Sequence, residues 1–343
     1  MKAPLLVATM VISFSMLTYS GIGQSKRGKQ SVASQNFTIQ LVAPGVWAAI
    51  ANDHYGKAIC NAGIVDLGNK TIVFDPFMNP QAATELRQMA EQLTGKPVSL
   101  VVNSHYHNDH IRGNQSFGPA AIISTSFTRD EIERVEPREQ QWEARHASGL
   151  LKATRQRMSS ATSVEKEELA LWIGYYEGMV ESASELKMTL PDIVFNDSLW
   201  IFGSQRVVKL MEFRNGHTPS DAVLMIPDAG VAFMGDLLFV NRHPWISDGH
   251  PVSWQASLKT FYEDPVYNIF VPGHGPIAQK NDLQQLHHYF GAVTDLCTAA
   301  ATDSLQLILL QQPIPQAYQH WFFGRFYQQN LQYILGSLRK EDE

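Results

Sequence analysis

The sequence predicts a layered α/β sandwich, in which two blocks of strands are separated and flanked by helices. Apolar, β-branched runs gather in residues 37–105 and again in 191–274, and turn signals break both blocks. Residues 127–187, between the blocks, are rich in Glu, Arg and Lys and poor in Gly and Pro, which predicts two or three helices. The tail from about Asp282 is again helical in character. This alternation is typical of helices packed on stacked sheets.

The elements follow in order along the chain. FTIQLVAPGVWAAIA and AGIVDLGNKTIVFDPF predict strands with turns between them, and VSLVVNSH predicts a short apolar strand. Between them, PQAATELRQMAEQLTG predicts a helix that Gly95 and Pro97 end. After the helical insert, strands are predicted in PDIVFNDSLWIFGSQRVVKLMEF, DAVLMIPDAG, VAFMGDLLF and YNIFVPGH.

Composition limits the function classes. The chain has 343 residues, of which 44% are hydrophobic, so one large domain with additions is expected. A net charge of −6 argues against a nucleic-acid partner. With only two cysteines, Cys60 and Cys297, the chain is no disulfide scaffold, and whether the two pair is left open.

The N-terminus predicts an export signal. Lys2 precedes the apolar run APLLVATMVISFSMLTY, and small residues follow in SGIGQS, so residues 1–24 are interpreted as a cleaved signal peptide. The basic residues just after the run favour the alternative, a retained membrane anchor. The run is slightly short of the roughly 20 residues that span a bilayer. We therefore expect a periplasmic or secreted protein without stable membrane insertion.

One short stretch, NSHYHNDH at residues 103–110, carries the chemistry. His105 and His107 are two residues apart, so an extended backbone can point both to one side. Asp109 and His110 follow where the chain turns toward a helix. Imidazole nitrogens and carboxylates are ligands that zinc prefers outside thiolate sites. Four such groups on one loop indicate two metals rather than one.

Three further candidate ligands stand near strand ends. His217 follows RVVKLMEF, Asp236 follows VAFM, and His274 follows YNIFV. Glycine flanks each of them, which permits close backbone approach to a crowded centre. Each is a weak signal alone, but the set in this order strengthens the prediction of a metal site.

The ordered motifs HYHNDH, GHT, GD and GHG resemble the metallo-β-lactamase superfamily. The resemblance implies an αββα four-layer sandwich over residues 36–280, interrupted by the helical insert 127–187 and followed by a helical C-terminal extension, 281–343. It also implies two metal ions. By position, His105, His107 and His217 would bind the first, and Asp109, His110 and His274 the second. Asp236 would bridge them, and Asp75 in VFDP would steady the histidine loop, with a structural cap as its alternative role.

The bridging Asp236 makes the chain more similar to the glyoxalase II and lactonase-like branch than to true β-lactamases. The resemblance therefore implies a dinuclear zinc hydrolase acting on a small-molecule ester, thioester, lactone or lactam. Its nucleophile would be a metal-bound hydroxide that Asp109 orients. Three alternatives remain: a true β-lactamase, a mononuclear iron dioxygenase acting on persulfides, and a non-catalytic metal-binding protein. The oligomeric state is left open.

Three regions are candidates for the substrate pocket. His54 and Tyr55 lie in the turn NDHYGK, where the family often has a mobile loop, and a solvent-exposed turn is the alternative. Arg242, His243 and Trp245 follow Asp236 directly and could line the mouth, although Trp245 could equally serve packing. The insert carries ALWIGYYEGM, which is more typical of a buried helix face and could also form a wall or lid.

Overall fold

The computed structural model describes residues 34–300 and 312–341. The predicted signal peptide, residues 1–24, lies outside the described residues. Within the described part of the chain, no helix is both long and apolar enough to span a bilayer. Cys60 and Cys297 are both buried and unpaired, so they form no disulfide.

The first sheet follows the order of the sequence. Its strands are β1 (Phe37–Ala43), β2 (Val46–Ala51), β3 (Ala62–Asp66), β4 (Thr71–Phe74), β5 (Leu100–Val102), β6 (Ala121–Thr125) and β7 (Ile193–Phe195). Neighbours from β1 to β4 are antiparallel, and those from β4 to β7 are parallel. Helix α1 (Pro80–Thr94) connects β4 to β5. Asn79 caps its start, and left-handed Gly95 (φ 70°) ends it.

The second sheet has the order β12-β11-β10-β9-β8. Its strands are β8 (Ser198–Phe202), β9 (Val207–Arg214), β10 (Ser220–Ile226), β11 (Val231–Phe239) and β12 (Ile269–His274). Neighbours are antiparallel except β11 and β12, which are parallel. Helix α5 (Pro251–Glu263) supplies the crossover between these two strands. Every residue of β10 and β11 is buried, as expected for strands covered on both faces.

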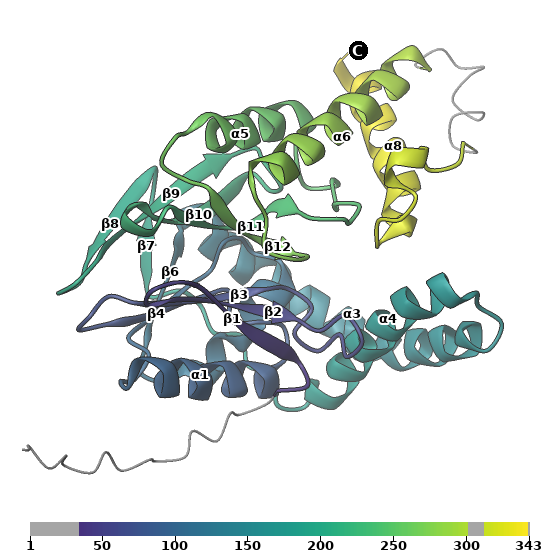
Figure 1. Cartoon of the computed structure of the whole chain (residues 1–343). Coiled ribbons are helices and arrows are strands. Elements are labelled where there is room, and N and C mark those ends of the chain that lie inside the picture. Colours follow the sequence, from purple (N-terminus) through teal and green to yellow (C-terminus); the bar gives the residue numbers. More distant parts are fainter. Residues whose placement is uncertain (1–33, 301–311, 342–343) are drawn as a thin grey trace, which may run out of the picture. The chain divides into compact units, whose positions relative to one another are not determined.

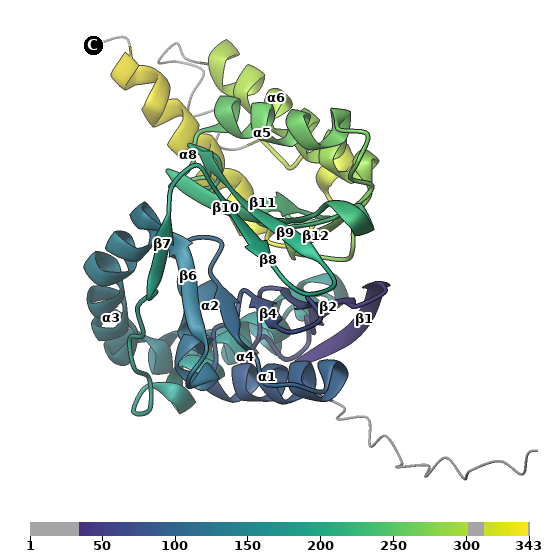
Figure 2. The ribbon, with the colours of Figure 1, turned by 90° about the vertical axis from the view of Figure 1, so that its left-hand side faces the viewer.

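The two sheets face each other and enclose the central core, and Figures 1 and 2 show helices on their outer sides. Between the sheets, Phe74 of β4 packs in one cluster with Leu224 and Phe233 of β10 and β11. On the outer face of the first sheet, α1 contributes Leu86 to a second cluster. On the outer face of the second sheet, α5 and α6 (Lys280–Ala299) build a third cluster around Trp254. These layers confirm the predicted αββα sandwich.

Two additions extend the sandwich. The insert consists of α3 (Ser126–Met158) and α4 (Ser163–Ser182), which pack against each other. The described residues of the C-terminal extension include α6, the short 3-10 turn η3 (Gln316–Tyr318) and α8 (Gly324–Glu341). A fourth apolar cluster joins the additions to the sandwich, because it combines Leu151 and Trp172 of the insert with Phe323 of the extension and Met78 of the first sheet's side.

The sequence prediction omitted two elements. Strand β6, AIIST, is too short for its apolar run to stand out, and it becomes a strand by pairing with both β5 and β7. Helix α5 begins at Pro251, directly after the loop that was interpreted only as a pocket mouth. The proline at its first position and the His250 side chain, which accepts from the Ser253 amide, start this helix.

Candidate metal centre

The strand ends of the first sheet deliver the histidine loop. Strand β5 ends at Val102, and the chain runs through His105 to His107, which precedes the short helix α2 (Asn108–Ile111). The two rings meet edge to face, with centroids 4.6 Å apart, so both point to one side as predicted. Asp109 and His110 lie in α2, whose turn brings them back beside the same centre.

The second sheet delivers the remaining three side chains. His217 follows β9, Asp236 lies within β11, and His274 ends β12. The space around Asp236 is so small that glycine is required both before it in β11 and beside it in β12. A Cβ on Gly273 would lie 1.9 Å from Asp236 Oδ1, and one on Gly235, which has φ +51°, would lie 2.6 Å from the Cβ of Ser104. The crowding predicted from the flanking glycines is therefore present.

The seven side chains form two groups at one edge of the paired sheets. Within each group, the atoms that could bind a metal lie within 4.8 Å of one another. One group is His105, His107, His217 and Asp236, and the other is Asp109, His110 and His274. The family resemblance implied the same division of side chains between two metals, with Asp236 shared.

Asp236 stands between the two groups and turns one oxygen to each. Its Oδ1 lies 3.2 Å from His110 Nε2 and 3.3 Å from His274 Nε2. Its Oδ2 lies 3.4 Å from His217 Nε2 and 4.0 Å from His105 Nε2. A carboxylate in this position can contribute one oxygen to each of two ions.

Each of the five histidines of the centre has one ring nitrogen that points away from the centre and contacts another group of the protein. The partners are Ser104 Oγ for His105 (2.9 Å), Asp248 Oδ2 for His107 (3.3 Å), Asp75 Oδ2 for His110 (2.8 Å), the Trp245 carbonyl for His217 (3.1 Å) and the Ile59 carbonyl for His274 (3.1 Å). Metal-binding histidines are held in this way, because the outer contact sets the tautomer and the ring orientation.

Asp75 holds the histidine loop at three points. Its carboxylate accepts from the Ser104 amide and the Ser104 hydroxyl, both at 2.8 Å, and contacts His110 Nδ1. The residue is fully buried and has φ 52°, a left-handed backbone that an aspartate tolerates better than most side chains. Both details indicate that the strand end is shaped to direct this carboxylate at the loop.

The histidine nitrogens that face the centre are better placed to bind metal ions than to form hydrogen bonds with one another. His105 Nε2 and His110 Nε2 are buried and have no hydrogen-bond partner, and neither has Asp236 Oδ1. His107 Nδ1 lies 2.9 Å from His217 Nε2, a contact that needs a proton on one of two basic nitrogens. Buried polar atoms without partners are costly, so a cation at each group would satisfy several of them at once.

The charges of the centre also suit cations. Burial lowers the pKa of His217 to about 3 and that of His105 well below its usual range, so both rings are neutral and able to coordinate. Burial opposes the charged forms of His274 and Asp236 as well. Their attraction outweighs it, raising the pKa of His274 to about 9 and holding that of Asp236 far below normal. A metal ion would take the place of the proton on His274.

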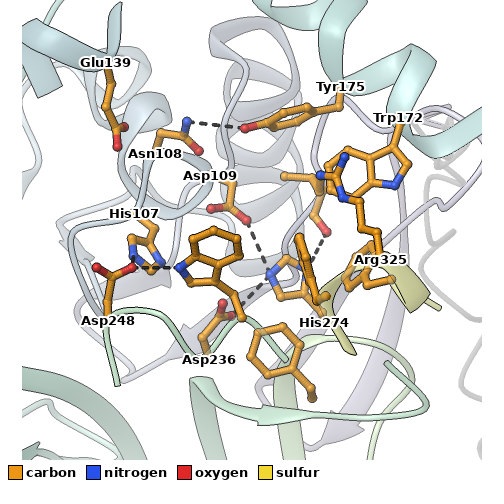
Figure 3. A pocket seen from close by; sticks show the side chains of 15 residues that line it. His107, Asn108, Asp109, Glu139, Trp172, Tyr175, Asp236, Asp248, His274 and Arg325 are labelled. Carbon is orange, nitrogen blue, oxygen red and sulfur yellow. Dashed lines mark hydrogen bonds and ion pairs between the residues drawn. The ribbon is translucent and has the colours of Figure 1, made fainter. Parts of the chain in front are cut away.

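A cavity of about 290 Å³ opens beside the centre (Figure 3). Four members of the two groups line one part of the cavity: Asp109, Asp236, His107 and His274. The walls come from the insert, from the loop after β11 and from the start of α8. They include Glu139, Trp172, Tyr175, Trp245, Asp248, Phe323, Arg325 and Phe326, and Asn108 of α2 joins them. Both additions to the sandwich therefore shape the pocket.

Of the two predicted pocket residues His243 and Trp245, the structure places only Trp245 in the cavity lining. Trp245 lines the cavity, and its indole donates to Asp248 Oδ2 at 2.7 Å. His243 does not: it is fully buried among Tyr289, Trp321 and Tyr327, with ring centroids 5.5–5.6 Å away. Its placement in the pocket mouth is corrected, because the C-terminal extension covers it.

Arg242 and the turn NDHYGK also lie away from the cavity lining. Arg242 is buried in an ion pair with Asp53, 2.6 Å long. His54 and Tyr55 are exposed and do not line the cavity. Gly56 faces the backbone of α4, where a Cβ would lie 2.1 Å from the Leu171 carbonyl, so the turn packs on the insert.

Sequence reasoning missed Asp248, Trp172, Tyr175 and Arg325 as members of the site. Asp248 lies in a loop with no periodic signal, although it stands in the segment already singled out after Asp236. Trp172 and Tyr175 lie in ALWIGYYEGM, which was given a wall as its alternative role. Nothing in the local sequence connects Arg325 to the centre.

Comparisons with known proteins agree with this geometry. The sequence model of the metallo-beta-lactamase superfamily matches residues 55–274. A solved metallo-beta-lactamase from Pontibacter korlensis is 14% identical, with a TM-score of 0.55, over 74% of this chain and 99% of that chain.

A second solved structure is a metallo beta lactamase from Erythrobacter litoralis with beta mercaptoethanol in its active site. It is 14% identical, with a TM-score of 0.53, over 76% of this chain and 99% of that chain. At such identity the likeness shows the fold alone, and a comparison with curated proteins found no match. The family match covers more than half of the sequence, including all seven clustered side chains, and the chain belongs to the metallo-beta-lactamase superfamily.

Proposed function

We propose that the protein is an exported dinuclear zinc hydrolase that cleaves a small-molecule ester, thioester, lactone or lactam. The observation that carries the proposal is the position of Asp236, whose two carboxylate oxygens face two separate groups of histidines. Members of the superfamily are generally metallo-hydrolases, and the candidate site lies at the cavity where a substrate would enter.

The donor set supports zinc. Five imidazole nitrogens and two carboxylates suit Zn²⁺, which binds nitrogen and oxygen ligands without a geometric demand of its own. The first ion would take His105, His107 and His217. The second would take Asp109, His110 and His274, with Asp236 shared between them. When bound, two zinc ions supply Lewis acidity to the substrate carbonyl and lower the pKa of water toward about 7.

The chain's own residues then orient the reactants. Burial opposes ionisation of Asp109, but the neighbouring His110 and His274 hold its pKa well below normal, so it is a carboxylate at neutral pH. It lines the cavity and can accept a proton from the attacking water. Among the described residues that line the cavity there is no Ser, Thr or Cys, so water is the nucleophile that the site supports.

The shared carboxylate favours oxygen and sulfur leaving groups. With two zinc ions bound, the Asp236 carboxylate would add negative charge between them. The site would then give less stabilisation to an amide nitrogen as it departs. Oxygen and sulfur leaving groups need less of that help. We therefore expect better turnover of esters, thioesters or lactones than of β-lactams.

Two measurements test the proposal. Elemental analysis of the purified protein should find about two zinc ions per chain, and one iron without zinc would instead support a persulfide dioxygenase. A panel of aryl esters, thioesters, lactones, penicillins, cephalosporins and carbapenems should then show the preference. Faster turnover of β-lactams than of every other class would make the protein a true β-lactamase, and no turnover with both ions bound would leave a metal-binding protein.

Export is a separate part of the proposal. It is supported by the charged start, apolar run and small residues of the first 24 positions. Mass spectrometry of the protein isolated from its native host should find a chain that begins after the small-residue segment SGIGQS. A mature protein that retains Lys2 would contradict cleavage and favour the anchor.

A further inference from the structure

The start of α8 brings a cation to the cavity. Among the residues that the structure describes, Arg325 is the one Lys or Arg side chain that lines it. Its guanidinium carbon lies 3.5 Å from the ring centroid of Trp172 and 5.0 Å from that of Phe326. Apart from the histidines of the centre, the other charged side chains of the lining are four carboxylates: Asp109, Glu139, Asp236 and Asp248.

Arg325 is exposed, unlike the buried Arg112 and Arg242, and it has no carboxylate partner within the described residues. Arg112 and Arg242 each form ion pairs within the protein. In the described part of the chain, no ion pair or hydrogen bond to the Arg325 side chain is found, and its contacts are with aromatic rings. A guanidinium stacked on a ring uses its face and keeps its in-plane N–H donors free, so it can still bind a carboxylate with two hydrogen bonds.

The stack is held in place from both additions. Glu168 of α4 accepts from the Trp172 indole at 3.2 Å and from the Gly324 amide at 3.4 Å. It therefore fixes the ring and the first residue of α8 together. Phe323, 2% exposed, packs 5.5 Å from the Trp172 ring. A receptor arranged before the ligand arrives loses less entropy on binding.

We propose that Arg325 binds a carboxylate of the substrate, while Trp172 and Phe326 contact the apolar group that carries it. The inference rests on the proposed hydrolase function and narrows its substrate to esters, thioesters or lactones with a carboxylate on one side of the reacting carbonyl. Figure 3 shows Arg325 on the His274 side of the cavity and Glu139 on the opposite side. An anionic group would therefore be attracted to the first side and repelled from the second.

The test compares two substrates that differ only in charge. One is the aryl half-ester of a short linear dicarboxylic acid, and the other is the same ester with its free acid converted to a primary amide. After subtraction of spontaneous hydrolysis, the wild type should have a kcat/KM about tenfold higher for the acid, mainly through KM. In Arg325→Met, which keeps the apolar stem, the ratio should fall to about one.

Matched variants identify the cause. Arg325→Lys should restore only part of the ratio, because an ammonium keeps the charge but not the stacked fork. Arg145→Met removes an exposed arginine that does not line the cavity, so it should keep the full ratio. An unchanged ratio in Arg325→Met would overturn the proposal, as would equal turnover of both esters by the wild type. A stronger Arg325-dependent preference for a phosphate-bearing analogue would overturn the assignment of a carboxylate.

Binding without turnover separates this inference from the proposed function. The amide isosteres of the two esters are poor substrates, and calorimetry with the purified protein should show tighter binding of the acid form. If no ester is hydrolysed but Arg325→Met removes this difference in binding, the hydrolase function is wrong and the carboxylate site stands. If esters are hydrolysed without any dependence on Arg325, the hydrolase function stands and the carboxylate site is wrong.

Discussion

The histidines of the metal centre and the aromatic walls of the cavity are held in different ways. Each of these histidines is fixed by a hydrogen bond between the ring nitrogen that points away from the centre and another group of the protein. For His110 that group is the Asp75 carboxylate. The walls are held mainly by apolar packing in a cluster that combines the insert, the C-terminal extension and the sandwich, to which Glu168 adds hydrogen bonds from the Trp172 indole and the Gly324 amide. The first arrangement is directional throughout, and the second is mainly not.

The difference separates chemistry from selectivity. A directional hydrogen bond sets the position of a ring nitrogen to within a fraction of an ångström, which a metal ligand requires. Apolar packing sets only shape and volume, so a wall can change its side chains and still pack. We expect substitutions at the centre to abolish activity and substitutions in the walls to change which substrate is used.

The strongest test of the comparison is Asp236→Ala. This substitution removes both oxygens that face the histidine groups, so we expect the zinc content to fall from about two to about one per chain and hydrolysis to fall to background. Asp236→Asn, which keeps the shape and one carbonyl oxygen, should retain more metal than the alanine variant. Full activity with both ions in Asp236→Ala would show that the carboxylate is not shared.

A second test asks how firmly the insert is attached to the histidine loop. Arg112 follows the loop, is buried, and pairs with Glu136 and Glu143 of α3. Arg112→Met would leave both buried carboxylates without a cationic partner, with one neutral donor each from Gln140 and Asn108, so urea unfolding should show a loss of about 3–5 kcal/mol. The matched control is Arg134→Met, which breaks an exposed pair with Glu131 and should cost less than about 1 kcal/mol. Equal losses in the two variants would contradict a stabilising role for the buried cluster.

A third test compares two carboxylates that hold histidines. Asp75 is fully buried and has three contacts with the loop, whereas the Asp248 side chain is 36% exposed and contacts His107 and Trp245. Competition with a chromophoric chelator should show zinc affinity reduced about a hundredfold in Asp75→Asn and about tenfold in Asp248→Asn. Asp228→Asn, at an exposed ion pair with Arg206, serves as the control. A larger effect at Asp248 would reverse our ranking of the two supports.

The centre was predictable because its signals are local. The spacing of His105, His107, Asp109 and His110 is contained in six residues, and the other three side chains stand beside glycine. His217 and His274 lie at strand ends, whereas Asp236, expected at one, lies within β11. Strand ends of neighbouring strands meet at one edge, so a pattern read along the chain becomes a cluster in space. The structure brings these residues together, and their role as zinc ligands stays a prediction.

The walls were predictable only in part. The insert had a wall as its alternative role and Trp245 lines the cavity, but the contacts between separate additions have no local signal. Trp172 and Arg325 are in contact but lie in separate additions, and an apolar helix face in a sequence does not reveal what packs on it. His243 shows that proximity in sequence can also mislead. It lies shortly after β11, the strand of Asp236, yet the C-terminal extension buries it against Tyr289 and Trp321. Both outcomes depend on long-range packing of the extension.

The smallest expected effect concerns pH and the wall opposite Arg325. Glu139 of α3 lines the cavity, and burial, helped by the charge of Glu136 and opposed by Arg112, raises its pKa to about 7. Its side chain is neutral below that pH and negative above it, so a carboxylate-bearing ester meets added repulsion as pH rises from about 6 to about 8. Because the side chain is 40% exposed, solvent screens the effect, and KM should rise only about two- to threefold. Steady-state kinetics should show no such rise for the neutral amide ester or for Glu139→Gln. An equal rise for the charged and neutral esters would assign the pH dependence to the metal centre instead of the wall.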